Sequence, residues 1–408
     1  MRIYLINQYF PPDTAATGQY LADVARALAG SGHEVHVICS QRTYSGGRGM
    51  LSSPKGGEYR VHRVAATGCG RMNLLGRLLD YLSFYVLALW KSLSLSKADV
   101  VVCLSTPPFV AVIGVLLSRL RGTRLVVWVM DLYPEVFVAF GVLKQNGLLY
   151  RFLRWVSAIV YQRAVGIISL GEVMRKRLVE AGAEERKIVT VHNWVPREAV
   201  HYMECLQSPL RQEWALNGHV ALVYSGNLGL GHELDTVIRA YEKLGKGTSV
   251  RLVFVGSGIM RETLERYVAE HGLDGVKFRR SEPLDRLSAL LGAGDIHLVA
   301  QRSGTEGLIV PSKIYGILAA GRPTIYIGPD DTEVAMILRD SGAGIIIAPG
   351  DVEGAAKAIE DLANDWNNRQ EMGRRALEWY TGHFGMARSV DVIVDLVKSV
   401  ACRQGKDK

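Results

Sequence analysis

The chain has 408 residues, of which 48% are hydrophobic, enough for two or three domains with real cores. Its five cysteines are scattered without a Cys-x-x-Cys pair, which argues against a disulfide framework and a cysteine zinc site. The charge is uneven, because residues 1–198 carry a net +11 and residues 199–408 a net −3. Only the first half is therefore expected to meet an anionic partner. Its basic residues are not interleaved with aromatic ones, so we expect no nucleic-acid partner and favour anionic lipid.

The first half alternates predicted strands and helices. Residues 1–7 predict a strand, and apolar residues at helical spacing after a proline-containing loop predict a helix that ends near residue 30. The longest uncharged window, 100–118, contains Pro107 and Pro108, which indicates a strand, a loop and a helix rather than a membrane span. The N-terminal apolar run is too short for a secretion signal. Further strands are predicted over 34–40, 100–104, 125–130 and 165–169.

The alternation restarts after an irregular stretch around residues 194–208, which we interpret as a linker. Repeated β-α alternation is typical of doubly wound parallel sheets. We therefore predict an α/β protein of two Rossmann-like domains facing across a cleft. The predicted domains are 1–198, 209–378 and a C-terminal helical segment, 379–408, that packs back on the first domain. Strands of the second half are predicted over 221–224, 251–255, 276–278, 296–300, 324–327 and 344–348.

Two loops in the second half each follow an apolar strand and lead into a helix. They are the glycine-rich turn at 225–231 and the segment 306–323, EGLIVPSKIYGILAAGRP. A helix N-terminus offers unpaired N–H groups and the positive end of the helix dipole, which suit phosphate. The two loops together predict a site that holds a nucleotide diphosphate.

Five segments in order along the chain resemble the GT-B glycosyltransferases and, within them, glycosyltransferase family 4. They are 9–18, 131–135 (DLYPE), 192–196 (HNWVP), 225–232 and 310–323. The subgroup most resembled makes bacterial exopolysaccharide and O-antigen, colanic-acid-type transferases included. The resemblance implies retaining transfer of a sugar from a nucleotide sugar, with a UDP-sugar favoured over a GDP-sugar. It also implies a lipid-linked (polyprenyl diphosphate) glycan as acceptor, and no obligatory protein nucleophile, since the departing phosphate helps to deprotonate the acceptor.

The chain departs from the family pattern around the donor diphosphate. Family members carry an arginine and then a lysine in the first glycine-rich turn, where this chain has Asn227 and His232. The two family glutamates, eight residues apart, correspond to Leu308 and Gly316. Glu306 can replace the first of them only if the loop is remodelled.

Other side chains are available to bind the donor. Lys313 could reach the diphosphate as a point charge, Arg302 could add a planar fork, and Ser312 could cap the helix or bond a phosphate oxygen. Their alternatives are a solvated first-turn lysine for Lys313 and a surface pair with Glu306 for Arg302. His232 is either a donor contact or an ordinary helix-entry residue. The remaining donor-binding candidates are Gly18, whose alternative is a tight turn, Gly226, Asn227, Glu306, Gly307 and Leu308.

Two acidic residues follow the apolar strand at 125–130, at the edge where α/β proteins bind ligands. Asp131 corresponds to a region where relatives place a polar residue on the acceptor side, and Glu135 lies one turn further on. Their alternative roles are a helix N-cap and a first-turn acid. We predict Asp131, Lys313 and His232 as catalytic residues and Glu135 as an acceptor-side residue.

The sequence predicts catalysis without a metal ion or other cofactor. Metal-dependent transferases use Asp-x-Asp, which occurs nowhere in this chain, and Asp330-Asp331 lacks the spacing. Charge that develops on the diphosphate must then be stabilised by helix dipoles and by Lys313, His232 and Arg302.

Residues 74–95 predict an amphipathic helix with leucines on one stripe and basic residues beside it. One interpretation is a core helix of the first domain. The other is a basic surface that lies on an anionic membrane, where lipid-linked acceptors are found. The second interpretation places the protein in the cytoplasm, peripheral at the inner face of the cytoplasmic membrane.

Two other functions stay open at this point. A sugar-nucleotide epimerase shares the two-domain fold but needs paired carboxylates, and only one convincing candidate is present. A non-catalytic nucleotide-sugar-binding relative would explain the loss of both family glutamates. A dehydrogenase is disfavoured, since no G-x-G-x-x-G follows the first strand.

Overall fold

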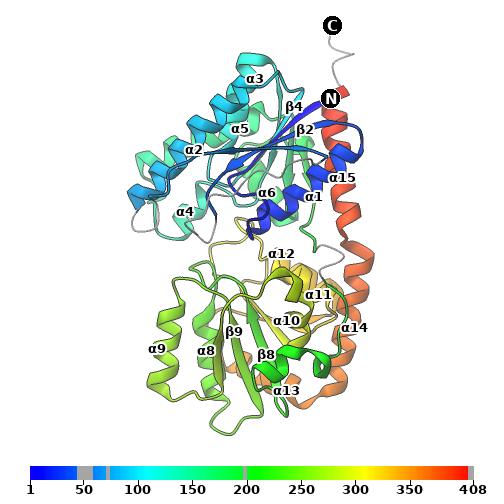
Figure 1. The fold of residues 1–408 in the computed structure, drawn as a ribbon. Helices are drawn as coiled ribbons and strands as arrows, with labels where there is room; N and C mark the ends of the chain where they lie inside the picture. Colours follow the sequence, from blue (N-terminus) through cyan, green and yellow to red (C-terminus); the bar gives the residue numbers. More distant parts are fainter. Residues whose placement is uncertain (44–57, 70–73, 196–199, 403–408) are drawn as a thin grey trace. The chain divides into compact units, whose positions relative to one another are not determined.

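The computed structural model describes residues 1–43, 58–69, 74–195 and 200–402. The chain forms two compact units (Figure 1). Unit 1 comprises Met1–His192, Gly307–Ile309 and the C-terminal segment from Ala387, and unit 2 comprises Asn193–Glu306 and Val310–Met386. The domain boundary predicted at residue 198 lies outside the described residues.

Unit 1 is built on a seven-stranded sheet in the order β3-β2-β1-β4-β5-β6-β7, with all strands parallel. Helices cover both faces of the sheet, which explains why its central strands are continuous runs of Val, Ile and Leu. Two strands were not predicted: β3 has two arginines and a histidine among its five residues, and β7 is three residues long. The strands are β1 (Arg2–Ile6), β2 (Glu34–Ser40), β3 (Arg60–Val64), β4 (Val100–Leu104), β5 (Arg124–Trp128), β6 (Gly166–Ser169) and β7 (Ile188–Thr190).

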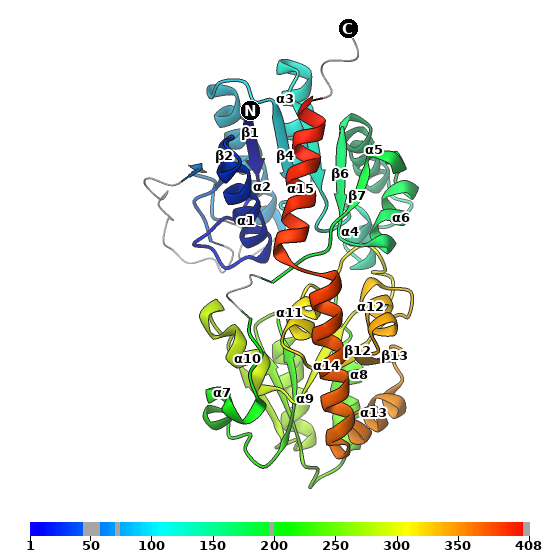
Figure 2. The ribbon, with the colours of Figure 1, turned by 90° about the vertical axis from the view of Figure 1, so that its right-hand side faces the viewer.

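The helices of unit 1 form a layer on each face of its sheet. On one face α2 packs against α3 and α3 against α5, whereas α1 and α15 cover the other face (Figures 1 and 2). The window 100–118 forms β4 and most of α3, so the predicted strand, loop and helix are confirmed. In the described part of the chain, every helix is too short or too polar to cross a bilayer. The helices are α1 (Ala16–Gly30), α2 (Leu74–Ser94), α3 (Ala111–Arg121), α4 (Glu135–Ala139), α5 (Leu148–Arg163), α6 (Glu172–Glu180) and α15 (Met386–Cys402), with the 3-10 turn η1 (Glu185–Lys187).

Helix α2 exposes the apolar stripe that its sequence shows. Phe84 and Ala88 are buried, but six large apolar side chains on the outer side of the helix are exposed. The core-helix interpretation is therefore wrong for this side of α2. The exposed residues are Leu75, Leu78, Leu79, Leu82, Val86 and Trp90.

Unit 2 is built on a six-stranded parallel sheet in the order β10-β9-β8-β11-β12-β13. Its apolar core includes one cluster with α8, α9 and α13 and another with α11, α12 and α14. The strands are β8 (Val220–Ser225), β9 (Val250–Val255), β10 (Val276–Arg279), β11 (Ile296–Ala300), β12 (Thr324–Ile327) and β13 (Gly344–Ile347). The helices are α7 (Pro209–Glu213), α8 (Leu234–Lys243), α9 (Arg261–His271), α10 (Leu287–Ala293), α11 (Lys313–Ala319), α12 (Glu333–Ser341), α13 (Val352–Asn364) and α14 (Trp366–His383), with the turns η2 (Cys205–Gln207) and η3 (Leu284–Arg286).

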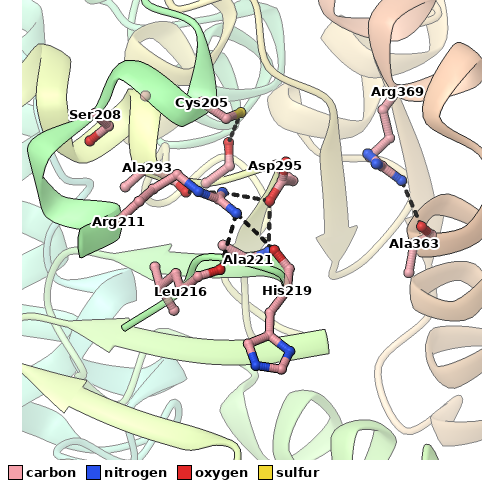
Figure 3. A network of polar contacts seen from close by, with 12 residues as sticks. Cys205, Ser208, Arg211, Leu216, His219, Ala221, Ala293, Asp295, Ala363 and Arg369 are labelled. Carbon is pink, nitrogen blue, oxygen red and sulfur yellow. Dashed lines mark hydrogen bonds and ion pairs between the residues drawn. The ribbon is translucent and has the colours of Figure 1, made fainter. Parts of the chain in front are cut away.

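A buried arginine fixes the amino ends of the central strands of unit 2 (Figure 3). Arg211 on α7 donates to the Asp295 carboxylate at 2.7 Å and to the carbonyls of Ala293, Leu216 and His219 at 3.0, 3.2 and 2.7 Å. Asp295 precedes β11 and also accepts from the N–H of Ala221 in β8 at 2.8 Å. The pair thus holds β8 beside β11 and satisfies backbone carbonyls that would otherwise lack partners.

The strand order of unit 2 reverses at β8, which lies between β9 and β11. Ligands of open parallel sheets bind at the carboxyl ends of the strands where this reversal occurs. The loops that follow β8 and β11 begin there, and they are the two loops that the sequence marked for a diphosphate.

Candidate functional site

The centre of the site in unit 2 is the amine of Lys313, the first residue of α11. Its Nζ is buried, lies 3.6 Å from the centre of the Tyr224 ring, and makes no hydrogen bond within the described part of the chain. Burial lowers the pKa of the amine to about 7. A buried amine without an acceptor is costly, which indicates that an anion completes the site. The solvated-lysine alternative is wrong for this residue.

Glycine is required where the loops after β8 and β9 meet beside Lys313. Gly226 has a φ of 132°, and a Cβ there would lie 3.3 Å from both Cε and Nζ of Lys313. Gly256 has a φ of 144°, and a Cβ there would lie 2.0 Å from the carbonyl oxygen of Gly226. The backbones of the two loops are therefore in direct contact. The sequence analysis missed Gly256 and the following Gly258; the available signal was a Gly-x-Gly directly after an apolar strand.

His232 lies in the same cluster as a neutral ring. Its Nδ1 lies 2.8 Å from the Ala300 carbonyl, and because a carbonyl only accepts, Nδ1–H is the donor and Nε2 remains an acceptor. Burial, and then the charge of Lys313, lowers the pKa of the imidazole to about 4. The expectation that His232 shares in neutralising a diphosphate does not fit this state. A neutral ring suits a hydroxyl group that donates to Nε2.

Three predicted donor-binding residues lie on the loop after β11 or at its end. The Arg302 N–H donates to the Gly231 carbonyl at 2.9 Å, which joins this loop to the one after β8, and the Arg302 side chain is exposed. The Glu306 carboxylate accepts from the Gly304 N–H at 2.8 Å. Ser312 occupies the N-cap position of α11, but its hydroxyl forms no capping bond, so the capping prediction is wrong.

Three further predicted donor residues have structural surroundings of their own. Tyr224 donates through its hydroxyl to the Asn227 carbonyl at 2.9 Å, which fixes the turn that carries the exposed Asn227. Gly307 and Leu308 belong to the short segment that groups with unit 1, where the Leu308 carbonyl accepts from the Leu132 N–H at 2.9 Å. They are therefore not part of the cluster around Lys313 in unit 2.

A chain of buried hydroxyl and amide groups supports the loop after β11. The Tyr326 hydroxyl lies 3.2 Å from Gln301 Oε1 and 2.8 Å from the Thr332 hydroxyl. The Gln301 amide donates to the carbonyl and the hydroxyl of Thr305, both at 3.2 Å. All four side chains are buried, so the network specifies one conformation of the loop.

The second candidate site lies in unit 1, around Asp131. The Ser105 hydroxyl accepts the N–H groups of Met130 and Asp131, at 2.8 and 3.0 Å, and so fixes the turn after β5. The carboxyl group borders a small cavity that Tyr133 and Ser157 also line. Burial raises its pKa to about 6, against a hydrogen bond from Tyr133 that favours the carboxylate. The sequence analysis missed Ser105 and Tyr133, and the DLYPE motif was the signal for Tyr133.

Asp131 does not cap a helix, so the capping alternative is wrong. Pro134 holds the N-cap position of α4, and Glu135 is its first residue. Burial raises the pKa of Glu135, whose Oε1 accepts from the Tyr150 hydroxyl at 3.5 Å, while Oε2 is buried and has no hydrogen-bond partner among the described residues. Gly18 packs on the backbone of its own loop, because a Cβ there would lie 3.0 Å from the Tyr9 carbonyl oxygen. That close contact favours the tight-turn alternative.

Two known protein families together match most of the chain. Residues 16–194 match the family described as Glycosyl transferase 4-like domain, and residues 208–379 match Glycosyl transferases group 1. The putative colanic acid biosynthesis glycosyl transferase WcaI of Escherichia coli K12 is 25% identical over 88% of this chain and 91% of its own. The probable glycosyltransferase WbjE of Pseudomonas aeruginosa is 26% identical over 65% of this chain and 66% of its own.

Solved structures share the fold over almost the whole length. The sucrose-phosphate synthase of Thermosynechococcus elongatus superposes with a TM-score of 0.81 at 14% identity, covering 98% of this chain and 99% of that one. Anabaena HepE in complex with UDP-glucose gives 0.73 at 15% identity, covering 98% and 100%. WaaG, a glycosyltransferase of lipopolysaccharide biosynthesis, gives 0.70 at 18% identity, covering 97% and 99%.

Proposed function

Because the chain belongs to the GT-B glycosyltransferases of family 4 type, we propose that it moves a sugar, with retention, from a nucleotide sugar to a lipid-linked glycan. The observation that carries this proposal is the buried, unpaired amine of Lys313 at the strand reversal of unit 2. A nucleotide diphosphate supplies the anion that this amine lacks. Two further phosphate contacts are proposed. Arg302 is exposed on the loop after β11, and Ser312 lies at the start of α11, where its hydroxyl makes no capping bond.

The donor is proposed to be a UDP-sugar. HepE, which shares the fold, is known in complexes with UDP and UDP-glucose, and this supports UDP over GDP without naming the sugar. His232 Nε2 is proposed to accept a hydroxyl of the donor rather than to neutralise phosphate. The departing phosphate is proposed to take the acceptor proton, so that no protein nucleophile is needed.

The acceptor side is proposed to be unit 1, with Asp131 orienting the incoming hydroxyl group through its carboxylate and Glu135 supporting that region. The names of two relatives support a polysaccharide acceptor, because WcaI is assigned to colanic acid biosynthesis and WaaG to lipopolysaccharide biosynthesis. The resemblance to family 4 implies that this acceptor is linked to a lipid. The exposed stripe of α2 is proposed to lie on an anionic membrane, at the inner face of the cytoplasmic membrane.

A thermal-shift screen of UDP, UDP-sugars, GDP and GDP-sugars tests the donor site directly. A ligand that binds only the native state raises the melting temperature, by an amount that grows with the logarithm of its concentration divided by its Kd. We expect UDP compounds to stabilise the wild type, and Lys313→Ala to bind them about ten to a hundred times more weakly, since a charge-assisted contact is worth about 1.5–3 kcal/mol. Equal affinity in both proteins would contradict the assignment of Lys313.

Turnover separates the remaining alternatives. Release of UDP in the presence of a membrane glycolipid extract, with sugar joined to the extract, is expected of a transferase. Saturable binding without any turnover would favour the non-catalytic relative, and conversion of one UDP-sugar into another without acceptor would favour the epimerase.

A further inference from the structure

A second exposed apolar surface lies on α5, at its N-terminal half. Leu148, Leu149, Phe152 and Trp155 have exposed fractions of 83%, 57%, 56% and 60%. The rings of Phe152 and Trp155 lie 5.9 Å apart between their centres. The opposite side of α5 is buried through Tyr150, Ser157, Val160 and Tyr161. Four large apolar side chains on two turns facing water are unusual unless something covers them.

The helices of this face carry mainly positive charge, and the acids next to α5 come from neighbouring elements: Glu135 of α4 lies near Arg154, and the Glu180 carbonyl accepts from Arg154 at 3.5 Å. Helix α5 has three arginines and no acidic residue, and no acidic residue occurs between positions 136 and 171. Across α2, α3 and α5 together there are seven basic residues and one acidic residue, Asp80. The Asp80 carboxylate already accepts from the Thr67 hydroxyl and the Cys69 N–H, at 2.7 and 2.9 Å.

The helix layer formed by α1 and α15, on the other face of the unit 1 sheet, differs in its charge balance and in its exposed apolar surface. Helices α1 and α15 carry three basic and three acidic residues, and among their described residues only Val392 is a large apolar side chain with substantial exposure, at 37%. Figure 1 shows these two helices on the opposite face of the sheet from α2, α3 and α5. Exposed apolar surface and unbalanced positive charge therefore coincide on one face of unit 1.

We propose that the segment 148–155 of α5 inserts into an anionic lipid leaflet as a second membrane-contacting element beside α2. Aromatic and leucine side chains enter the interfacial region of a bilayer, while Arg151 and Arg154 between them pair with lipid phosphate. A second copy of the chain fits less well, because a twofold contact through α5 would bring the arginines of one copy against those of the other, and α5 itself has no acidic residue. This inference extends the membrane surface proposed above, but it does not depend on transferase activity.

Vesicle sedimentation tests the α5 segment separately from α2. The variant Leu149→Gln, Phe152→Gln, Trp155→Gln is compared with wild type on vesicles of equal parts phosphatidylcholine and phosphatidylglycerol, and on phosphatidylcholine alone. The matched control is Trp366→Gln, since Trp366 is 62% exposed but lies in unit 2. We expect about tenfold weaker binding, or more, to the anionic vesicles for the α5 variant only, with its melting temperature unchanged.

The outcomes separate this inference from the proposal for α2. If the α5 variant binds like wild type while a polar variant of α2 is released, the inference fails and the α2 surface stands. If the wild type forms a dimer in solution and the α5 variant is monomeric, a second copy covers the face and the inference also fails.

Tryptophan quenching gives a readout that does not depend on the triple variant folding. Brominated lipids quench only those tryptophans that enter the bilayer, so Trp155→Phe is expected to lose part of the quenching seen in wild type. Trp366→Phe is expected to retain all of it. Equal quenching in wild type and Trp155→Phe would overturn the insertion of α5.

Discussion

At the scale of single residues, the surroundings of the Lys313 amine favour the binding of an anion. Its amine has an aromatic face on one side and no acceptor in the described chain, so burial works against the charged form. An arriving diphosphate would reverse this balance by favouring the ammonium ion. We therefore expect anion binding to be coupled to the protonation of Lys313.

The affinity for UDP is expected to fall as the pH rises above 7. With a pKa of about 7 in the free protein, the amine is charged below pH 7 and must take up a proton on binding above it. The loss should approach tenfold for each pH unit above 7 until the pKa of the complex is reached. Isothermal titration calorimetry in buffers of different ionisation enthalpy measures the proton uptake directly.

The matched control is Lys313→Arg, because a guanidinium stays protonated throughout this range. Its UDP affinity should not fall between pH 7 and 9. A wild type whose affinity stays constant and takes up no proton in that range would contradict the coupling.

Asp131 is expected to act on turnover rather than on donor binding. Its raised pKa of about 6 means that the carboxylate form is lost as the pH falls through 6, so turnover should rise with pH across that value. Asp131→Asn should depress turnover and remove this rise while leaving the UDP affinity within about twofold of wild type. Loss of UDP affinity in Asp131→Asn would contradict the assignment of Asp131 to the acceptor side.

At the scale of elements, one buried ion pair joins α7 to the central strands of unit 2, beside the apolar packing of Leu210. Removing one partner of a buried pair leaves the other charge without compensation, which typically costs about 3–5 kcal/mol. Arg211→Met is therefore expected to lower the free energy of unfolding of unit 2 by about that amount, as measured by urea denaturation.

An exposed pair provides the comparison. Arg374 and Glu371 on α14 form an ion pair whose side chains are both exposed to solvent, so Arg374→Ala should change the free energy of unfolding far less than Arg211→Met. The double variant Arg211→Met, Asp295→Leu should recover part of the loss, because no charge is then buried alone. Equal effects of Arg211→Met and Arg374→Ala would contradict the role given to the buried pair.

Helix α2 yields a prediction about surface rather than stability. Leu78, Leu82 and Val86 are exposed, so replacing all three with Gln should release the protein from anionic vesicles with little change in melting temperature. The half-buried Leu89 is left intact, since a polar group there would lose packing. Vesicle binding as strong as that of wild type, in a stable triple variant, would exclude α2 as a membrane contact.

At the scale of the whole molecule, the absence of Asp-x-Asp from the sequence predicts catalysis without a metal ion. In our proposal, Lys313 and backbone N–H groups of the loops would stabilise the charge on the leaving diphosphate. Turnover should survive an excess of EDTA within about twofold. Loss of turnover that Mg²⁺ or Mn²⁺ restores would show that this account of charge stabilisation is wrong.

The sequence by itself determined the two parallel sheets and the loops of the donor site. Mainly apolar runs such as β4 and β11 identify buried strands, and glycine before a helix identifies a turn that can bind phosphate, because both signals depend only on neighbouring residues. The second signal led to the prediction that Lys313, at the start of such a helix, contacts a diphosphate. The strands β3 and β7 were not predicted. Their own sequences lack a strand pattern, and they are strands because they pair with neighbouring strands in the sheet.

Only the tertiary structure decided the states of the site residues. The tautomer of His232 is set by the Ala300 carbonyl, 68 residues away, and the need for Gly256 comes from the backbone of Gly226 in another loop. The raised pKa of Asp131 and the exposure of Trp155 depend on what the folded chain places around them. Burial and contacts between distant segments are created by folding, so no local spacing in the sequence encodes them.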